Sequence, residues 1–230
     1  MLHALRLALC LFLLLGIAPS VHADQTDVAA VVSKVQAAYA DMQSFRSGFA
    51  QELFQRDSGV TQKRTGTLVF QRPLRVRWET AAPHPELLMV TDKEIWNYLP
   101  DEELAYRYSR ELAEDSRSLI QVVTGRSALT RDFDVEPAPE QTDGLIHLML
   151  FPKEPTATLT EAQLWIDPAT SLIRRAMVMD FYGNTNTVEL KDLKKNAAVT
   201  ASEFTFTPPK GTEVEDHIEA AHPVERALKN

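Results

Sequence analysis

The sequence predicts a mainly β protein of the α+β class, in which about eleven antiparallel strands follow one N-terminal helix. Short stretches of alternating apolar residues recur along the chain, and turn-forming residues separate them. This alternation gives way to helical spacing chiefly in two places. So many sequential hairpins favour a barrel or half-barrel, because closure limits exposed strand edges. The two helical segments then have one sensible place, across the concave face of the sheet.

The start of the chain has the pattern of a cleavable export signal and is excluded from the fold. A weakly basic start precedes an apolar run, residues 7–17, that is too short to span a bilayer, and Val21-His22-Ala23 fits the small-x-small cleavage pattern. We expect residues 1–23 to be removed, together with Cys10, the only cysteine. The alternative is an uncleaved N-terminal anchor. Residues 24–230 are then expected to form one domain with a polar tail from about residue 213.

The first element of this domain is a helix with one apolar face. Asp27 is expected as its N-cap. Such a helix either packs on a core or covers the mouth of a cavity, and the pattern does not distinguish the two. Apolar side chains recur at three- and four-residue spacing at Val28, Val31, Val32, Val35, Tyr39 and Met42.

The strands are expected in two groups, separated by one or two short helices between residues 111 and 125. Pro73 cannot donate to a ladder, so it marks a corner between two strands. The first group covers residues 45–53, 63–71, 74–79, 86–91, 94–99 and 104–108. The second group covers residues 132–136, 145–151, 162–167, 172–182 and 186–193. A helical turn at 201–203, an extended piece at 204–209 and a loosely held tail, with room for a short helix, complete the chain.

One face of this sheet carries bulky apolar side chains at alternate positions. A filled core is the more frequent meaning of such a stripe, and alternation does not distinguish a filled interior from a hollow one. Both faces of residues 176–181 are mixed, so their orientation is left open. The candidates for the apolar face are Phe49, Leu68, Phe70, Val76, Trp78, Trp96, Tyr98, Leu148, Leu150, Leu164 and Ile166.

Arg72 ends one of these strands on the apolar face, directly before Pro73. Burying a guanidinium without partners is costly. In one interpretation the stem packs on the sheet while the charged head reaches water. In the other, Arg72 is a latch that donates to backbone carbonyls of a covering helix, a role that suits its fork of donors better than lysine.

The charge balance excludes some classes of partner. The chain has 24 basic and 32 acidic residues, and loss of Arg6 with the signal leaves 23 against 32, a net charge of −9. This argues against nucleic acid, whose binding requires a basic footprint, and against standing adsorption to an anionic membrane.

The sequence contains none of the catalytic motifs that we sought. There is no nucleophile elbow, P-loop or dinucleotide-binding glycine pattern, and no histidine pair has a metal-ligand spacing. We therefore expect no enzyme activity, no metal and no cofactor. A secreted, β-rich chain of this kind is suited to holding something apolar.

Three groups of residues, in order along nearly the whole mature chain, resemble the LolA family of periplasmic carriers of outer-membrane lipoproteins. They are F-x-Q with G-T-L-x-F-x-R-P-x-x-x-R-W-E, then L-L-x-x-T-D-x-x-x-W-x-Y-x-P, and finally F-T-F-T-P-P-x-G. The matching residues are Phe49, Gln51, Gly66, Leu68, Phe70, Arg72, Pro73, Arg77, Trp78, Glu79, Leu87, Leu88, Asp92, Trp96, Tyr98, Pro100 and residues 204–211.

The resemblance implies an open β-barrel with a helical lid over a hydrophobic cavity, which the apolar face described above lines. It implies that Arg72 is the latch, bonded to the lid backbone in the closed state and released when lipid binds. The implied lid residues are Val35 and Tyr39 in the first helix, with Leu119, Ile120 and Val123 in the second helical segment.

The implied function is transport without chemistry. The carrier takes an acylated lipoprotein from an inner-membrane ABC-type release complex, shields its acyl chains across the periplasm and hands it to an outer-membrane receptor. It is not expected to insert stably into either membrane or to bind nucleic acid. Residues 107–131 match the family only loosely, the tail beyond residue 216 does not match it, and the negative net charge does not fit a basic carrier docking on acidic partners.

Three other functions remain open at the sequence level. The first is a periplasmic carrier or sensor of another lipid or glycolipid, since a fold does not fix a ligand. The second is an enzyme acting on lipid or glycan with carboxylates that the fold brings together. The third is an envelope-stress regulator that senses mislocalised lipoproteins, although such chains usually carry a second domain.

Overall fold

The computed structural model describes residues 27–114, 119–140 and 143–218. The predicted export signal lies outside these residues, as does the end of the tail. The described chain forms one twelve-stranded sheet in the order β12-β6-β5-β4-β3-β2-β1-β11-β10-β9-β8-β7. Its two end strands are not paired with each other, so the sheet is open. This confirms the predicted mainly β, open-barrel fold.

All eleven predicted strands are present among the described residues, together with a twelfth, β12, and four α-helices. The strands are β1 Ser44–Gln55, β2 Val60–Gln71, β3 Arg75–Thr80, β4 Glu86–Val90, β5 Glu94–Leu99, β6 Leu104–Ser109, β7 Phe133–Pro137, β8 Ile146–Pro152, β9 Glu161–Ile166, β10 Ile173–Met179, β11 Thr185–Lys195 and β12 Glu213–His217. The helices are α1 Val28–Ala40, α2 Glu111–Glu114, α3 Leu119–Val123 and α4 Leu129–Asp132, with 3₁₀ turns η1 Pro100–Glu102 and η2 Ala201–Phe204.

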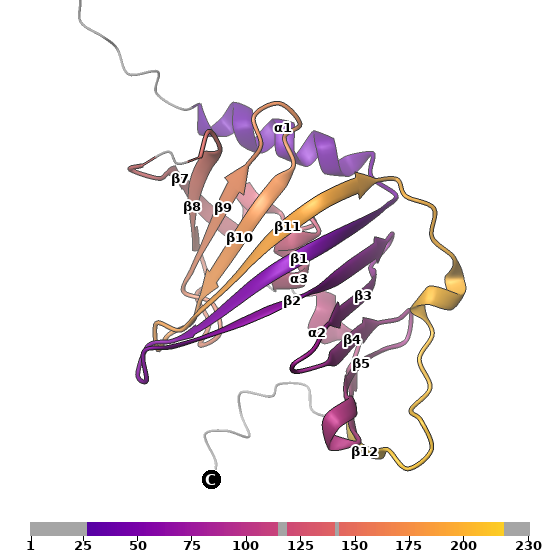
Figure 1. The fold of residues 1–230 in the computed structure, drawn as a ribbon. Coiled ribbons are helices and arrows are strands. Elements are labelled where there is room, and N and C mark those ends of the chain that lie inside the picture. The colour runs from indigo at the N-terminus through magenta and orange to yellow at the C-terminus, as the bar shows by residue number, and fades with distance from the viewer. Residues whose placement is uncertain (1–26, 115–118, 141–142, 219–230) are drawn as a thin grey trace, which may run out of the picture.

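The sheet curves around the helices. In Figure 1, α2 and α3 lie behind the sheet and α1 runs across its upper end. One large core cluster joins the inner face of the sheet to buried residues of the helices, among them Val32 and Val35 of α1 and Val122 and Val123 of α3. The helices therefore cover the concave face, because that is where their apolar stripes and those of the strands are buried together.

The helix α1 follows from its local sequence. The Asp27 carboxylate accepts a hydrogen bond from the Ala30 backbone N–H at 3.1 Å, so Asp27 is the predicted N-cap. The side chains of Val32, Val35 and Tyr39 are buried at the predicted spacing. Of the two roles that the sequence left open for this helix, packing on the core is the one that the structure displays.

The C-terminal segment departs from the prediction. Residues 213–217, expected as part of a loose tail, form β12, which pairs in parallel with β6 at the edge of an otherwise antiparallel sheet. The 3₁₀ turn η2 occupies the predicted helical turn and includes Phe204, and Thr205 after it is extended, as predicted for this piece. Local sequence did not reveal β12 because its pattern is polar, and its pairing depends on the course of the chain before it.

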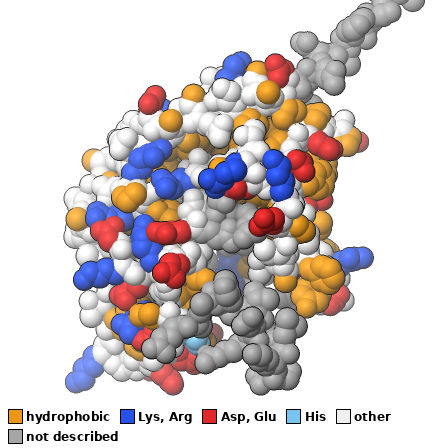
Figure 2. Space-filling model, turned by 180° about the vertical axis from the view of Figure 1, so that it is seen from behind, with side chains coloured by type: hydrophobic (Ala, Val, Ile, Leu, Met, Phe, Trp, Pro, Cys, Tyr) orange, Lys and Arg blue, Asp and Glu red, His pale blue; other side chains and the backbone are white. Residues whose placement is uncertain are grey.

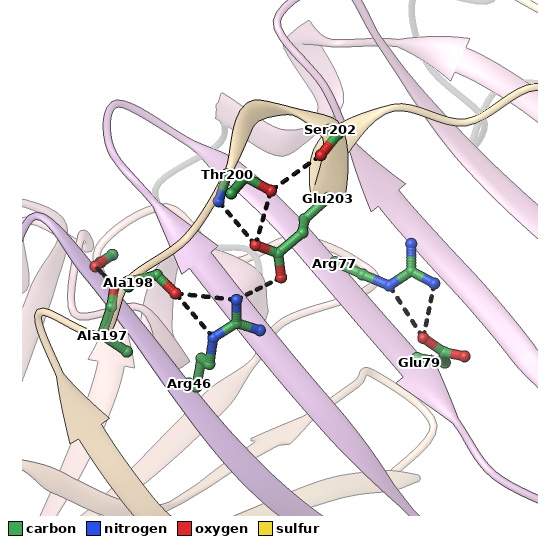
Figure 3. A network of polar contacts seen from close by, with 9 residues as sticks. Arg46, Arg77, Glu79, Ala197, Ala198, Thr200, Ser202 and Glu203 are labelled. Atoms are coloured by element: carbon green, nitrogen blue, oxygen red, sulfur yellow. Dashed lines mark hydrogen bonds and ion pairs between the residues drawn. The ribbon is translucent and has the colours of Figure 1, made fainter.

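This segment crosses the convex face of the sheet before it reaches β12. The Arg46 guanidinium donates to the Ala198 carbonyl at 3.0 and 3.2 Å and forms an ion pair with Glu203. Figure 3 shows these contacts and the capping box in which the Glu203 carboxylate accepts from the Thr200 N–H at 2.7 Å. The buried Phe204 then packs in a second, smaller core cluster on this convex face.

Candidate binding cavity

A cavity of about 390 Å³ lies on the concave side, between β1–β4, β11 and α3. One part of its lining is apolar and the other is polar. The apolar part is made by Leu53, Trp78, Leu88, Leu119 and Ile120. The polar part is made by Gln51, Arg64, Thr80, Glu86 and Asn186.

Most of the residues predicted for the apolar face lie on the concave side, but they fill a core instead of lining the cavity. Of the set, Trp78 is the one that borders it, together with the predicted lid residues Leu119 and Ile120. The others are 0–2 % exposed in the large core cluster: Phe49, Leu68, Phe70, Val76, Leu148, Leu150, Leu164 and Ile166. In this closed arrangement their contact with a ligand stays a prediction.

The prediction that Trp96 and Tyr98 belong to the same apolar face as the other candidates is wrong. Their neighbour Ile95 belongs to the concave core, whereas Trp96 packs in the convex cluster with Met89. Both aromatic rings contact Phe206, with centroid separations of 5.5 Å for Trp96 and 5.4 Å for Tyr98. Side chains alternate across a strand, so Trp96 and Tyr98, two positions apart, must share a face of β5. The alternation does not say whether that face is the concave or the convex one. The concave face of these strands carries Val90 and Ile95, which are opposite each other in β4 and β5 and belong to the large core cluster.

Arg72 directly follows β2 and reaches the C-terminal end of α1. Its Nε donates to the Met42 carbonyl at 2.7 Å, and its Nη2 donates to the Tyr39 carbonyl at 2.8 Å. Carbonyls at the end of a helix lack intrahelical partners and carry the negative end of the helix dipole. A guanidinium is well suited to satisfy two of them at once. The sequence left two interpretations of Arg72 open. Its position agrees with the one in which the guanidinium donates to backbone carbonyls of a covering helix.

Tyr39 connects α1 with two other elements. Its hydroxyl accepts a hydrogen bond from the Ile173 backbone N–H of β10 at 3.2 Å, and burial raises the pKa of this hydroxyl well above its ordinary value. Its ring lies so close to Gly125, just after α3, that a Cβ on that glycine would be 2.2 Å from ring carbons. Tyr39 therefore packs the two lid helices against each other and against the sheet. The other predicted lid residues, Val35 and Val123, are also buried there.

Two further arginines, Arg110 and Arg126, lie near Arg72. The sequence patterns did not point to either of them. Arg110 donates to the Leu74 carbonyl at 3.2 Å and also to the Thr91 carbonyl. Burial lowers the pKa of Arg126, and the neighbouring charges of Arg72 and Arg110 lower it further. Arginines scattered over 55 positions of the sequence converge here, which no local pattern could indicate.

Other kinds of site are not found in the described part of the chain. No group of three or more histidine, cysteine or carboxylate side chains there could hold a metal ion. No helix among the described residues has the length and hydrophobicity needed to cross a membrane. On the face seen in Figure 2, acidic and basic side chains are interspersed, with hydrophobic side chains between them.

Comparison with known proteins gives one consistent family. Residues 40–207 match the family described as "Outer membrane lipoprotein carrier protein LolA". The outer-membrane lipoprotein carrier protein of Bordetella avium is 30% identical over 205 residues, covering 87% of this chain and 92% of that protein. The corresponding protein of Bordetella pertussis is 33% identical over 161 residues, covering 68% of this chain and 72% of that protein.

A solved structure supports the fold independently. An uncharacterized conserved protein from Thermus thermophilus has a TM-score of 0.52 and 14% identity, covering 82% of this chain and 98% of that one. At this identity the likeness concerns the fold alone. The family assignment rests on the sequence match, which spans β1 to β11 and η2. This chain therefore belongs to the LolA family of outer-membrane lipoprotein carrier proteins.

Proposed function

We propose that this protein is a periplasmic carrier that binds the acyl chains of lipoproteins released from the inner membrane and transfers them to the outer membrane. The observation that carries the proposal is the construction of the concave face. An apolar sheet is covered there by short helices, and Arg72 joins the end of α1 to the sheet side of the core by two hydrogen bonds.

In this proposal the lid must move when a long acyl chain binds, because the cavity is small. At about 390 Å³, it lies toward the small end of the range for ligand pockets, whereas the core beside it is filled. A long acyl chain gains about 0.8 kcal/mol per buried CH₂ group. Loading therefore replaces contacts between helices and sheet by contacts between chain and sheet. The predicted cavity residues that are buried in the concave core, among them Phe49 and Ile166, can contact the ligand only when α1 and α3 move away.

The latch role of Arg72 follows from the need to release the cargo. A carrier must bind acyl chains without retaining them. Hydrogen bonds to a charged donor are worth about 1.5–3 kcal/mol each, so two of them favour the closed, empty form by a few kcal/mol. In the proposed cycle, acyl chains break these bonds on entry, and the bonds re-form when an outer-membrane receptor accepts the lipoprotein.

The proposed cycle needs no catalysis and no cofactor. The partners are an inner-membrane ABC-type release complex, the acylated lipoprotein and an outer-membrane lipoprotein receptor. Each step is a transfer of apolar surface between protected sites, so free diffusion of an acyl chain through water is avoided.

The test is to incubate the purified mature protein with a detergent-solubilised, acylated lipoprotein and then to remove the detergent. We expect a soluble 1:1 complex on gel filtration, and no complex with the unacylated form of the same lipoprotein. A complex that forms without acylation, or none at all, contradicts the proposal. A different lipid recovered from the protein by mass spectrometry would then favour the carrier or sensor of another lipid.

A further inference from the structure

The polar part of the cavity lining consists of side chains that are paired with one another. The Gln51 Nε2 donates to Asn186 Oδ1 at 2.9 Å, joining β1 to β11. The Arg64 Nη1 donates to Glu86 Oε2 at 2.7 Å, joining β2 to β4, and Nη2 donates to Gln62 Oε1 at 3.1 Å. The side chains of Arg64 and Glu86 are only 22% and 25% exposed. The polar wall is defined here as Gln51, Arg64, Glu86 and Asn186.

One donor of this wall has no acceptor. The Arg64 Nε is buried and makes no hydrogen bond within the described residues. A guanidinium has five donors and no acceptor, and a buried donor without a partner is costly. Arg64 itself borders the cavity, so a small turn of its side chain would bring this donor to an entering molecule.

The charge of the wall restricts what that molecule can be. The positive charge of Arg64 is already balanced by Glu86 at 2.7 Å. An anionic group, such as a phosphate, would be attracted by the guanidinium and repelled by the carboxylate beside it. A neutral acceptor, such as a carbonyl oxygen, fits the unpaired donor without this repulsion. The apolar part of the cavity lining includes Trp78, Leu88 and Ile120.

We propose that the polar wall binds the carbonyl oxygens that link acyl chains to the lipid-modified end of the cargo, with Arg64 as the principal donor. This inference rests on the proposed function and adds a polar recognition site to it. The hydrocarbon lies against the apolar side, and the ester or amide carbonyl at its head accepts from Arg64 Nε. The wall thereby fixes the depth to which an acyl chain enters.

The site follows from tertiary structure and was not predicted. Gln51 and Arg64 are directly opposite each other in the β1–β2 register, and Thr80 and Glu86 are opposite each other in β3–β4. The strands β1 to β4 therefore bring Gln51, Arg64, Thr80 and Glu86 to one end of the concave face. Further along the same strands, the inward positions are the apolar Phe49, Leu68 and Trp78.

The experiment compares two synthetic lipopeptides with identical chains. One carries two acyl chains on its cysteine through ester links, and the other carries the same chains through ether links, which lack carbonyl oxygens. Each displaces a fluorescent fatty-acid probe from the purified protein. We expect the ester form to bind about tenfold more tightly, as one hydrogen bond to a charged donor predicts.

Variants assign the preference to Arg64. In Arg64→Met the preference should fall to near unity, while the ether form binds as it does to the wild type. Arg64→Lys keeps a charge opposite Glu86 but has no Nε, and the preference should fall at least threefold. The matched control is Arg77→Met, because Arg77 pairs with Glu79 on the convex face at 2.8 Å (Figure 3), and it should keep the full preference. Thermal melting by circular dichroism establishes that each variant is folded.

The outcomes separate this inference from the proposed function. Equal binding of both lipopeptides by the wild type overturns the polar recognition site and leaves the carrier intact. Failure to bind either lipopeptide contradicts the carrier itself. An unchanged preference in a folded Arg64→Lys overturns the assignment to Nε. A phospholipid with the same ester links is expected to bind more weakly than the ester lipopeptide, and tighter binding would overturn the preference for a neutral acceptor.

Discussion

The backbone carbonyl of Tyr39 accepts a 2.8 Å hydrogen bond from the Arg72 guanidinium, while the hydroxyl of the same tyrosine accepts from the Ile173 N–H. One residue of α1 is thus bonded at both ends, once near β2 and once in β10. These strands lie on either side of the central pair β1 and β11. The position of α1 is therefore held by hydrogen bonds that involve both halves of the sheet.

Substitution of Arg72 tests the proposed latch. In Arg72→Leu the carbonyls of Tyr39 and Met42 lose their donor, so the empty, closed form is destabilised relative to the loaded one. We expect the variant to load lipoprotein but to hand it on at least about tenfold less efficiently, since each lost bond is worth about 1.5–3 kcal/mol. The measurement is transfer from loaded protein to outer-membrane vesicles.

Arg46→Leu is the matched control for this experiment, because Arg46 also donates to a backbone carbonyl, that of Ala198, but on the convex face. It should transfer normally. Normal onward transfer by Arg72→Leu would rule out the latch.

Gly125→Ala should loosen the contact between the two lid helices. Gly125 has a positive φ of 66°, and an added Cβ would lie 2.2 Å from the Tyr39 ring. The left-handed conformation alone costs a non-glycine residue about 1–2 kcal/mol, and overpacking adds about 1–3 kcal/mol. Urea denaturation measures the loss of unfolding free energy.

Gly144→Ala separates the two contributions, because Gly144 has a similar φ of 69° and its added Cβ meets no described atom within 4 Å. It should show the conformational cost alone. If both variants lose the same stability, the ring of Tyr39 does not confine Gly125.

Gly66→Ala should disrupt the junction of β2 with β3. Its Cβ would lie 2.0 Å from the Glu79 carbonyl oxygen and 2.7 Å from the Phe49 ring. Because the first of these atoms is backbone, it cannot move without displacing a strand. We expect a loss of at least about 3 kcal/mol, in the range of severe single substitutions, or failure to fold.

The control for this prediction is in the partner strand. Gly48→Ala places a Cβ 3.7 Å from its nearest neighbour, an ordinary contact, and glycine within a strand is itself weakening. This variant should be as stable as the wild type by thermal melting. Comparable melting temperatures for the two variants would contradict the argument from close approach.

Acid should weaken the attachment of η2 to the convex face. The Thr200 N–H and then the Arg46 guanidinium hold the pKa of the Glu203 carboxyl below its ordinary value. A group whose pKa is lowered by folding contributes stability above the ordinary pKa, near 4.3, and loses it as pH falls through the lower folded value. Glu203→Gln should therefore cost about 1 kcal/mol at pH 7, as loss of a capping interaction does, and progressively less below roughly pH 4.

Urea denaturation at several pH values measures this difference between wild type and variant. Glu52→Gln serves as the control, since its pairing with Lys63 is between exposed side chains and is worth little. A difference that does not shrink in acid would show that Glu203 stabilises the segment without its charge.

The sequence predicted the elements well where the signal is local. The alternation of apolar residues located eleven strands, the spacing of Val32, Val35 and Tyr39 located α1, and Asp27 was its cap. Arg72 stands out in the sequence because a guanidinium on an apolar stripe requires partners. Each of these features depends on residues a few positions apart, which is the range over which backbone periodicity acts.

Other features depended on which distant segments meet. Nothing in β5 says that Ile95 faces the concave core and Trp96 the convex face; the packing of Phe204 and Phe206 from the C-terminal segment decides it. The parallel pairing of β12 with β6, between residues more than 100 positions apart, likewise has no local signal.

The sequence by itself therefore determined the family, the strands and a single arginine without an obvious partner. Only the tertiary structure decided which face is concave, which carbonyls Arg72 binds, and that Arg64 pairs with Glu86 in the polar wall of the cavity. The physical reason is that secondary structure follows from the periodicity of neighbouring side chains, whereas burial and pairing follow from contacts between strands that are distant in the chain.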